Sequence, residues 1–277
     1  MKVFARRTAV VTGAGSGIGL AIARRLAAEG MRVVLADIDE PAARAVAADL
    51  TAAGHEALGV GVDVSRASDV ERLASVATEA FGEVHLLCNN AGIDGYRGGA
   101  LWEASDGQWA WSMGVNFSGV VHGIRAFVPG MLAHGDEAHV VNTASLASFT
   151  KPVSVYGVTK HAVLALTEAL DVQLRARGSR IGVTALCPGY TRTRLFEGGR
   201  TRPPGLADAA ADDNVAARDD RRARHAQLLA VGVAPSEVAD QLIKGVRENK
   251  LYVLTDTHWD AEIQERFVEI MTSFLQR

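Results

Sequence analysis

Tyr156 and Lys160 are the two residues of this chain whose types and spacing best suit proton transfer. They lie four positions apart in a segment expected to be helical, so both side chains point to one face. A tyrosine hydroxyl titrates near ~10, and to act as a base near neutrality its pKa must fall by ~2–3, which corresponds to about 3–4 kcal/mol. A lysine ammonium one turn away has the sign and the reach to lower it. Alone, the pair also fits an aromatic residue at a helix start beside a solvated lysine.

Ser145 ends a strand-like run eleven residues before Tyr156, and its hydroxyl could hold a substrate oxygen and stabilise charge there. Ser148 and Thr143 are competing candidates. Thr143 shares the face of Ser145 by the strand period of two, but it lies farther from the carboxyl end of the sheet, where such folds bind ligands. Asn116 lies on an apolar stripe at helical spacing, where a polar side chain must find partners. It is either a catalytic residue or an amide satisfied within the core.

A glycine-rich turn near the N-terminus indicates where phosphate groups bind. Gly13, Gly17 and Gly19 lie between an apolar strand and a helix, with Ser16 and Ile18 among them. Glycine permits a tight exit from the strand, and missing side chains let a pyrophosphate approach the backbone and the helix N-terminus. The spacing is T-G-x-x-x-G-x-G and not the general fingerprint G-x-G-x-x-G. Its place between strand and helix favours a phosphate-binding turn over an ordinary one.

Asp37 ends the second strand-like segment, about 20 residues past the glycines, where a carboxylate can accept hydrogen bonds from adenosine ribose hydroxyls. It would repel a 2′-phosphate, and neither Ile38 nor Ser16 supplies a cation for that group. We therefore expect NAD as the cofactor and not NADP. An aspartate that merely ends a strand is the alternative, and it does not explain the missing cations.

The elements that must position these residues alternate between strand-like and helix-like segments along the chain. Apolar strands separated by helices imply a parallel sheet covered on both faces, with right-handed crossovers. We therefore predict an α/β fold, a Rossmann-like doubly wound parallel sheet in a single domain of residues 1–277. The expected strands are 9–11, 31–37, 57–64, 84–89, 139–145, 180–188 and 251–254. The expected helices are 17–30, 41–53, 68–81, 106–132, 155–177 and 235–248.

The segment 191–232 departs from this alternation. It has no strand pattern and contains Gly198-Gly199, Pro203-Pro204 and a mixed-charge run over 212–224. A long irregular insertion in a compact domain is usually a functional loop or a disordered segment. Because it follows the sixth strand directly, we predict a substrate lid.

Composition narrows the possible classes of protein. The chain is 48% apolar and 22% charged with a net charge of −3, which gives no electrostatic footprint for nucleic acid or an anionic membrane. No apolar run approaches the roughly 20 residues of a membrane span, and no apolar signal-peptide region accompanies Arg6-Arg7, so the cytoplasm is expected. Cys88 and Cys187 lie in apolar runs and are expected in the core. With no metal-ligand spacing such as Cys-x-x-Cys, no metal is expected.

Taken together, these motifs resemble the short-chain dehydrogenase/reductase family, in its shorter single-domain branch. The resemblance extends from about Thr8 to Thr193 and more weakly to the C-terminus. It rests on Thr12-Gly13-x-x-x-Gly17-Ile18-Gly19, Asp63, Asn89-Asn90-Ala91-Gly92, Asn116, Ser145, Tyr156-x-x-x-Lys160 and Pro188-Gly189-Tyr190-Thr191-Arg192-Thr193. The loop from Ser145 to Tyr156 is shorter than in many members, which suggests an altered pocket wall.

The resemblance implies a role for each of these positions. Tyr156 would be the acid/base that takes the alcohol proton, Ser145 would position the substrate oxygen, and Lys160 would lower the tyrosine pKa and hold the nicotinamide ribose. Asn116 would hold a water in a proton relay to Lys160. The other implied cofactor contacts are Asp63 and Val64 at the adenine, Asn90, Ala91 and Gly92 at the ribose, and Pro188, Gly189, Thr191 and Thr193 at the carboxamide. Because members usually assemble, a homo-tetramer or homo-dimer is expected.

The expected function is NAD-dependent interconversion of a secondary alcohol and a ketone, a small-molecule substrate. The substrate is expected to be hydrophobic or aromatic, because the segments around the site carry apolar residues, although these could equally belong to the core. They are Trp102, Phe149, Pro152, Val153, Tyr190 and Phe196. Two alternatives stay open: an epimerase or dehydratase relative, and an NAD-binding regulatory or scaffold protein without turnover.

Overall fold

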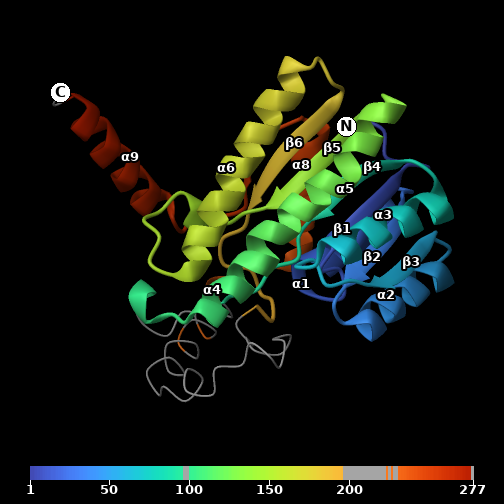
Figure 1. Cartoon of the computed structure of the whole chain (residues 1–277), viewed down its shortest axis with the longest axis horizontal. Helices are drawn as coiled ribbons and strands as arrows, with labels where there is room; N and C mark the ends of the chain where they lie inside the picture. The colour runs from blue at the N-terminus through green and yellow to red at the C-terminus, as the bar shows by residue number, and fades with distance from the viewer. Residues whose placement is uncertain (96–99, 196–222, 224–225, 227–229, 276–277) are drawn as a thin grey trace.

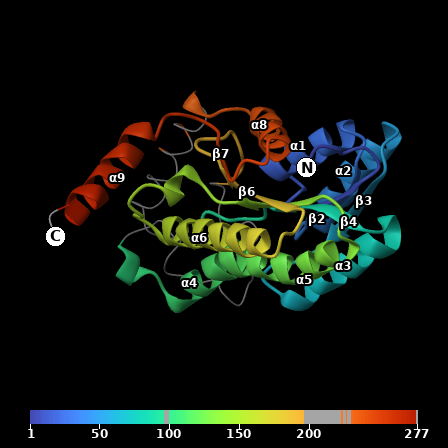
Figure 2. The ribbon, with the colours of Figure 1, turned by 90° about the horizontal axis from the view of Figure 1, so that it is seen from above.

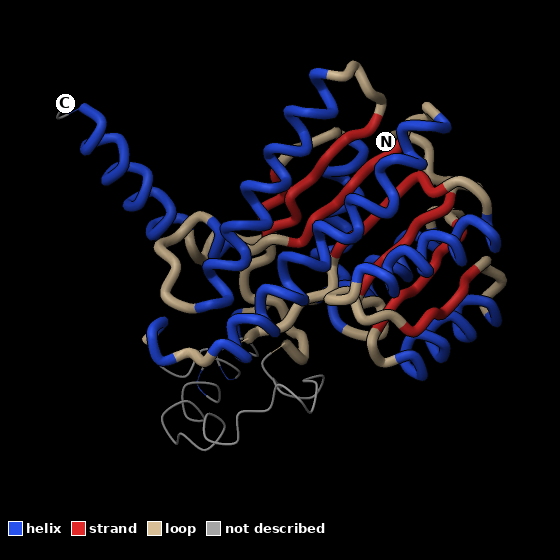
Figure 3. Tube along the Cα trace, in the orientation of Figure 1, coloured by secondary structure: helices blue, strands red, loops and turns tan. Residues whose placement is uncertain are grey.

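Short apolar strands form the centre of the molecule. The computed structural model describes residues 1–95, 100–195, 223, 226 and 230–275, and in this part of the chain seven parallel strands pair in the order β3-β2-β1-β4-β5-β6-β7. Figure 3 shows them side by side with helices on both faces. The strands are β1 (Thr8–Thr12), β2 (Arg32–Asp37), β3 (Ala57–Gly61), β4 (Val84–Asn89), β5 (Ala138–Thr143), β6 (Ile181–Cys187) and β7 (Tyr252–Leu254).

Helices cover the sheet in two layers (Figure 2). On one face lie α1 (Gly17–Ala28), α2 (Glu40–Ala52) and α8 (Pro235–Arg247). On the other lie α3 (Ala67–Phe81), α4 (Asp106–Met113), α5 (Gly119–His134) and α6 (Val155–Ala176). The last helix, α9 (Asp260–Leu275), extends away from both layers (Figure 1).

The strands are apolar throughout because successive side chains enter opposite layers. In β1, Ala9 and Val11 pack with Leu26 of α1, whereas Val10 packs in the other layer with Leu73 of α3. All of these side chains are buried. The two helix layers therefore have separate cores joined through one sheet.

The strand order reverses between β1 and β4. The chain runs outward from β1 through β2 to β3, then returns to the other side of β1 and continues to β7. In open parallel sheets, ligands bind at the carboxyl ends of the strands where the order reverses. The ends of β1, β4, β5 and β6 thus define the expected site.

The predicted fold class is confirmed, and four local predictions need correction. The third strand stops at Gly61 and not at residue 64. The fifth stops at Thr143 and not at Ser145, because Ser145 caps the short 3-10 helix Leu146–Ser148 by accepting from the Ala147 amide. The expected helix 106–132 is interrupted by a π-helical turn, Gly114–Ser118, between α4 and α5. Helix α9 was not expected at all. None of the helices in the described part of the chain is long and apolar enough to cross a membrane.

The ends of the predicted lid lie together. Thr191 and Val233 form an isolated parallel bridge, and the Arg192 amide donates to the Val233 carbonyl at 3.0 Å. Residues 196–222, which would form most of the lid, are outside the described residues, so the lid stays a prediction.

Candidate active site

One cavity of about 300 Å³ opens at the carboxyl ends of the strands. It brings together most of the residues singled out in the sequence. Those that line it are Gly13, Ser16, Gly17, Ile18, Asp37, Ile38, Asp63, Val64, Asn90, Ala91, Gly92, Ser145, Tyr156, Lys160, Pro188, Gly189, Thr191 and Thr193. Of the predicted site residues, Gly19 and Asn116 do not line it.

The glycine turn owes its shape to close backbone contacts. Gly13 has φ +65°, and a Cβ there would lie 2.9 Å from the Ala91 Cα. A Cβ on Gly19 would lie 2.1 Å from the Gly13 carbonyl oxygen, so Gly19 lets α1 pack against the turn. Gly19 therefore supports the turn without lining the cavity, while Gly13 and Gly17 line it.

Thr12 fixes the turn to the end of β4. Its hydroxyl oxygen accepts hydrogen bonds from the Asn90 and Ala91 amides at 2.9 and 3.0 Å, and the Asn90 side-chain amide donates to the Thr12 carbonyl at 3.0 Å. The sequence reasoning gave Thr12 no role of its own. The feature that could have indicated this role is its position as the last residue of the first strand, directly before Gly13.

Asp37 lies at the end of β2 with both carboxylate oxygens engaged. The Gly15 amide donates to one oxygen at 2.8 Å and the Asp39 amide to the other at 3.0 Å. These bonds fix a negative charge beside the glycine turn. Farther along the wall, the Asp63 carboxylate accepts from the Ser65 amide and hydroxyl at 3.0 and 2.6 Å.

Lys160 is buried beneath the catalytic candidates. Its Nζ donates to the Thr143 carbonyl at 2.7 Å and lies 5.7 Å from the centroid of the Tyr156 ring. Burial lowers the pKa of Lys160 to about 8. The group is therefore still mainly an ammonium at neutral pH, next to a tyrosine ring that is itself 9% exposed.

Ser145 lies two residues beyond the end of β5 and is held there by two contacts. Its hydroxyl donates to the Pro188 carbonyl at 3.3 Å and accepts from the Ala147 amide at 3.2 Å. The competing Ser148 does not line the cavity, because its hydroxyl donates to the Lys160 carbonyl at 2.8 Å. Thr143 does line it, so it remains a neighbour of Ser145 in the site.

Asn116 is fully buried in the π-helical turn. Its side-chain oxygen Oδ1 accepts from the Ile93 backbone amide at 2.8 Å. Its side-chain nitrogen Nδ2 donates to the Ile93 backbone carbonyl and to the Thr159 hydroxyl, both at 3.0 Å. It thus has the partners that a core amide needs. It is also close to the cavity wall, since a Cβ on Gly92 would lie 3.4 Å from both Asn116 Oδ1 and Lys160 Nζ.

The expected substrate wall is partly different. Pro152, Val153 and Tyr190 line the cavity, but Trp102 is 87% exposed and does not. Phe149 is also outside it, with its ring 6.0 Å from Tyr252. Phe196 is outside the described residues. Trp111 and Trp259 also line the cavity, although no motif in the sequence indicated either one. The centroid of the Trp259 ring lies 5.5 Å from that of Tyr190, with the two rings tilted.

Comparison with known proteins agrees with this arrangement. Residues 7–203 match the family model described as short chain dehydrogenase. The chain belongs to the short-chain dehydrogenase/reductase family. It contains the oxidoreductase fold of that family across its whole described length.

The relatives that this chain resembles are named as dehydrogenases or reductases. A crystal structure of a short-chain dehydrogenase/reductase from Burkholderia phymatum in complex with NAD is 41% identical, covers 100% of this chain and 97% of its own, and superimposes with a TM-score of 0.94. The 1-deoxy-11-beta-hydroxypentalenate dehydrogenase of Streptomyces exfoliatus is 41% identical over 77% of this chain and 76% of its own length. A CLA biosynthesis dehydrogenase/reductase of Lactiplantibacillus plantarum is 30% identical over 98% and 96%.

Proposed function

We propose that this protein is an NAD-dependent oxidoreductase that interconverts a secondary alcohol and a ketone. One observation carries the proposal: a single cavity is bordered by the glycine turn and Asp37 at one end, and by Ser145, Tyr156 and Lys160 at the other. A dinucleotide that spans such a cavity would bring its nicotinamide beside the tyrosine.

The fit to NAD rests on the chemistry of the cavity wall. A Cβ at Gly13 would lie 2.9 Å from the Ala91 Cα and one at Gly17 would lie 3.2 Å from Thr193 Cγ2, and both residues have the positive φ that favours glycine. The turn that would receive a pyrophosphate therefore needs glycine at both positions. The fixed Asp37 carboxylate would bond the ribose hydroxyls and repel a 2′-phosphate. The Burkholderia phymatum relative was solved with NAD, which supports the same choice here.

When bound, NAD would supply the hydride acceptor for oxidation of the substrate carbon. Tyr156 accepts the hydroxyl proton of the alcohol, and returns a proton to the carbonyl oxygen in the reverse direction. Ser145 donates a hydrogen bond to the same oxygen and holds it beside the tyrosine. The Lys160 ammonium stabilises the tyrosinate by its charge.

We assign Asn116 to the supply of protons to Lys160. Gly92 lies between Asn116 Oδ1 and Lys160 Nζ. Because Gly92 has no side chain, both polar atoms are within reach of one bridging water. The Asn116 amide is fixed by Ile93 and Thr159, so its oxygen keeps a constant direction.

We propose that the substrate is hydrophobic. Leu146, Trp111, Val153 and Trp259 border the cavity around the catalytic residues, and apolar walls of this kind bind apolar ring systems. The name of the Streptomyces exfoliatus relative, a dehydrogenase of a hydroxypentalenate, supports a substrate that carries a hydroxyl group.

A panel of hydrophobic secondary alcohols and their ketones, tested with NAD and NADH, examines this function. Absorbance at 340 nm should rise with at least one alcohol and fall with the matching ketone. Turnover of a sugar nucleotide without net NADH would support an epimerase or dehydratase instead. Tight NAD binding without turnover of any member of the panel would favour the regulatory alternative.

We further propose that the protein is a homo-oligomer and that α9 forms part of its interface. None of the described residues of α9 is buried, and its apolar stripe is about half exposed at Phe267, Ile270 and Met271. A lone 16-residue helix is only marginally stable in water, so it needs a surface to cover the stripe. These three side chains expose on the order of 300 Å² per copy, a part of the roughly 800 Å² that each partner buries in a standard protein interface.

The base of α9 is joined to the wall of the cavity. Arg266 donates to the Thr150 carbonyl at 3.0 Å, and Lys151 pairs with Glu269 at 2.5 Å. Thr150 and Lys151 both line the cavity. A second copy of this chain packed on α9 would therefore also fix this wall.

Sedimentation equilibrium of the wild-type chain should give a dimer or tetramer. Replacing Phe267 and Met271 by Gln should shift it to a smaller species, whereas Thr272→Gln on the same helix should not. A monomeric wild type would refute the assembly, and an unchanged size of the double variant would remove α9 from the interface. A cytoplasmic location stays a prediction from the sequence.

A further inference from the structure

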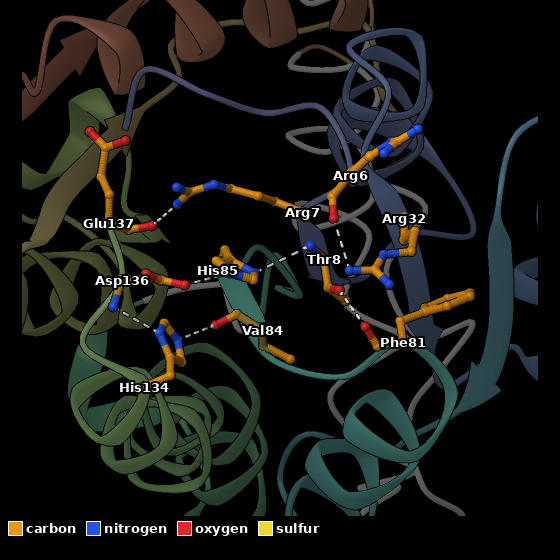
Figure 4. Close-up of polar contacts among 10 residues, drawn as sticks. All are labelled: Arg6, Arg7, Thr8, Arg32, Phe81, Val84, His85, His134, Asp136 and Glu137. Carbon is orange, nitrogen blue, oxygen red and sulfur yellow. Dashed lines mark hydrogen bonds and ion pairs between the residues drawn. The ribbon is translucent and has the colours of Figure 1, made fainter.

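His85, His134 and Asp136 gather at the end of the sheet opposite the cavity. His85 is the second residue of β4, His134 is the last residue of α5, and Asp136 follows in the turn to β5. One possible ligand atom from each residue lies within 4.8 Å of those from the other two. Figure 4 shows the two rings and the carboxylate facing one another. The proposed reaction uses none of them, because it takes place at the carboxyl ends of the strands.

The hydrogen bonds of His134 fix its tautomer. Nε2 lies 3.1 Å from the Val84 carbonyl oxygen, and only a protonated ring nitrogen can bond that acceptor. Nδ1 therefore carries the lone pair, and at present it accepts from the Asp136 amide at 3.1 Å. A histidine that binds a metal usually donates its other ring N–H to a carboxylate or a backbone carbonyl. His134 already has this arrangement.

His85 directs its other nitrogen to the same place. Nδ1 accepts a long hydrogen bond of 3.4 Å from the Thr8 amide, while Nε2 lies 3.8 Å from Asp136 Oδ2. An ion at Nε2 therefore requires the ring proton to move to Nδ1, with loss of the long bond from Thr8, and the Glu83 backbone carbonyl is an acceptor near the ring. Burial, with Arg7 and His134 nearby, lowers the pKa of His85. The lowered pKa favours the neutral ring, the form that binds metals.

We propose that His85 Nε2, His134 Nδ1 and the Asp136 carboxylate bind one Zn²⁺ ion, with water as the fourth ligand. Two imidazoles and a carboxylate are a ligand set that zinc accepts in tetrahedral geometry. Bonds of about 2.0–2.1 Å place tetrahedral ligand atoms about 3.3 Å apart, so the three groups must draw together by about 1.5 Å at most. The Asp136 side chain is 61% exposed, so it can rotate toward the ion and leaves a path from solvent.

Two charges of opposite sign act on a cation at this position. The Arg7 guanidinium, which donates to the backbone carbonyl of Glu137, opposes it, as its effect on the pKa of His85 shows. The Asp136 carboxylate faces the two rings and would offset this repulsion as a ligand. The Glu137 carboxylate lies 3.7 Å from the Met1 ammonium and compensates it. Zinc there would join β4, the end of α5 and the turn to β5, and would stabilise the fold without touching the cavity.

The test uses the full chain, without an added polyhistidine tag, after treatment with a chelator that is then removed. Isothermal titration with ZnSO₄ should give one saturable site per chain. At a zinc concentration about 100-fold above the dissociation constant, the Tm should rise by roughly 5–10 °C. Cobalt(II) should produce the visible absorption of a tetrahedral site.

Variants separate this site from adventitious binding. His85→Gln or His134→Gln should weaken zinc binding by about 10–100-fold or more and remove the Tm rise. Asp136→Asn should weaken it less. His55→Gln, at a histidine in the turn before β3, and Asp49→Asn, on α2, are the matched controls and should bind zinc as the wild type does.

Circular dichroism and NAD binding identify any variant that has failed to fold, since the NAD site lies at the other end of the sheet. The absence of a saturable site in the wild type would overturn the proposal. Equal zinc affinity in wild type and in folded His134→Gln would do the same.

Discussion

At the scale of single residues, Lys160 combines burial with a charge. Its lowered pKa of about 8 means that the folded state holds fewer protons than the unfolded state between pH 8 and about 10.5. The unfolded state then binds the extra proton, so this residue's contribution to the free energy of unfolding rises with pH across that window. The free energy of unfolding of the wild type, relative to that of Lys160→Met, should rise by on the order of 3 kcal/mol between pH 8 and pH 10.5. Denaturant unfolding of both proteins measures the difference; a constant difference would mean that Lys160 titrates normally.

Asp37 carries the proposed cofactor preference. Asp37→Ala removes a charged acceptor of ribose hydrogen bonds and the anchor of the Gly15 amide. NAD affinity should fall by roughly 10–100-fold, and the preference for NAD over NADP should narrow. Fluorescence titration with both cofactors measures this, with Asp49→Ala on α2 as the control. Equal affinity of the wild type for NADP would contradict the assignment.

At the scale of elements, the packing of α1 against the glycine turn can be tested at Gly19. An alanine Cβ there would meet the Gly13 carbonyl oxygen at 2.1 Å, so α1 or the turn must move. Gly19→Ala should cost about 1–3 kcal/mol of unfolding free energy and also weaken NAD binding. Gly130→Ala in α5 is the matched control, because nothing lies within 4 Å of its Cβ, and it should be neutral or stabilising by up to ~1 kcal/mol. Similar effects of the two substitutions would show that Gly19 is not a packing position.

The elements also separate what the sequence could predict from what it could not. Strands such as β4 were found with their bounds because an apolar run between helices has few other solutions. The π-helical turn around Asn116 was missed, since a single wider turn is too short to change the pattern of a long apolar stripe. Its contacts with the Ile93 backbone also depend on a segment distant in the sequence. Helix α9 was missed although Ile263, Phe267, Ile270 and Met271 have helical spacing. Only Ile263, at its start, packs against the core of the described part of the chain, while Phe267, Ile270 and Met271 are about half exposed.

At the scale of the whole molecule, topology explains why the motifs could be assembled from sequence. Parallel strands end at one edge of the sheet, so residues at the ends of β1, β2, β4, β5 and β6 meet there. The position of the strand ends does not predict which side chains from loops and helices pack into the cavity. Trp111 and Trp259 enter the cavity and Trp102 does not, and the His85–His134–Asp136 cluster joins residues far apart in the chain. Such contacts depend on three-dimensional packing, which no local spacing records.

The central claim is that Tyr156 exchanges the substrate proton beside NAD, and Tyr156→Phe tests it most directly. The substitution removes only the hydroxyl and keeps the buried ring, so the variant should fold and bind NAD with wild-type affinity. Its turnover of the best alcohol from the panel, followed at 340 nm, should fall by a factor of ~10² or more. A folded, NAD-binding Tyr156→Phe protein that retains wild-type turnover would contradict the account.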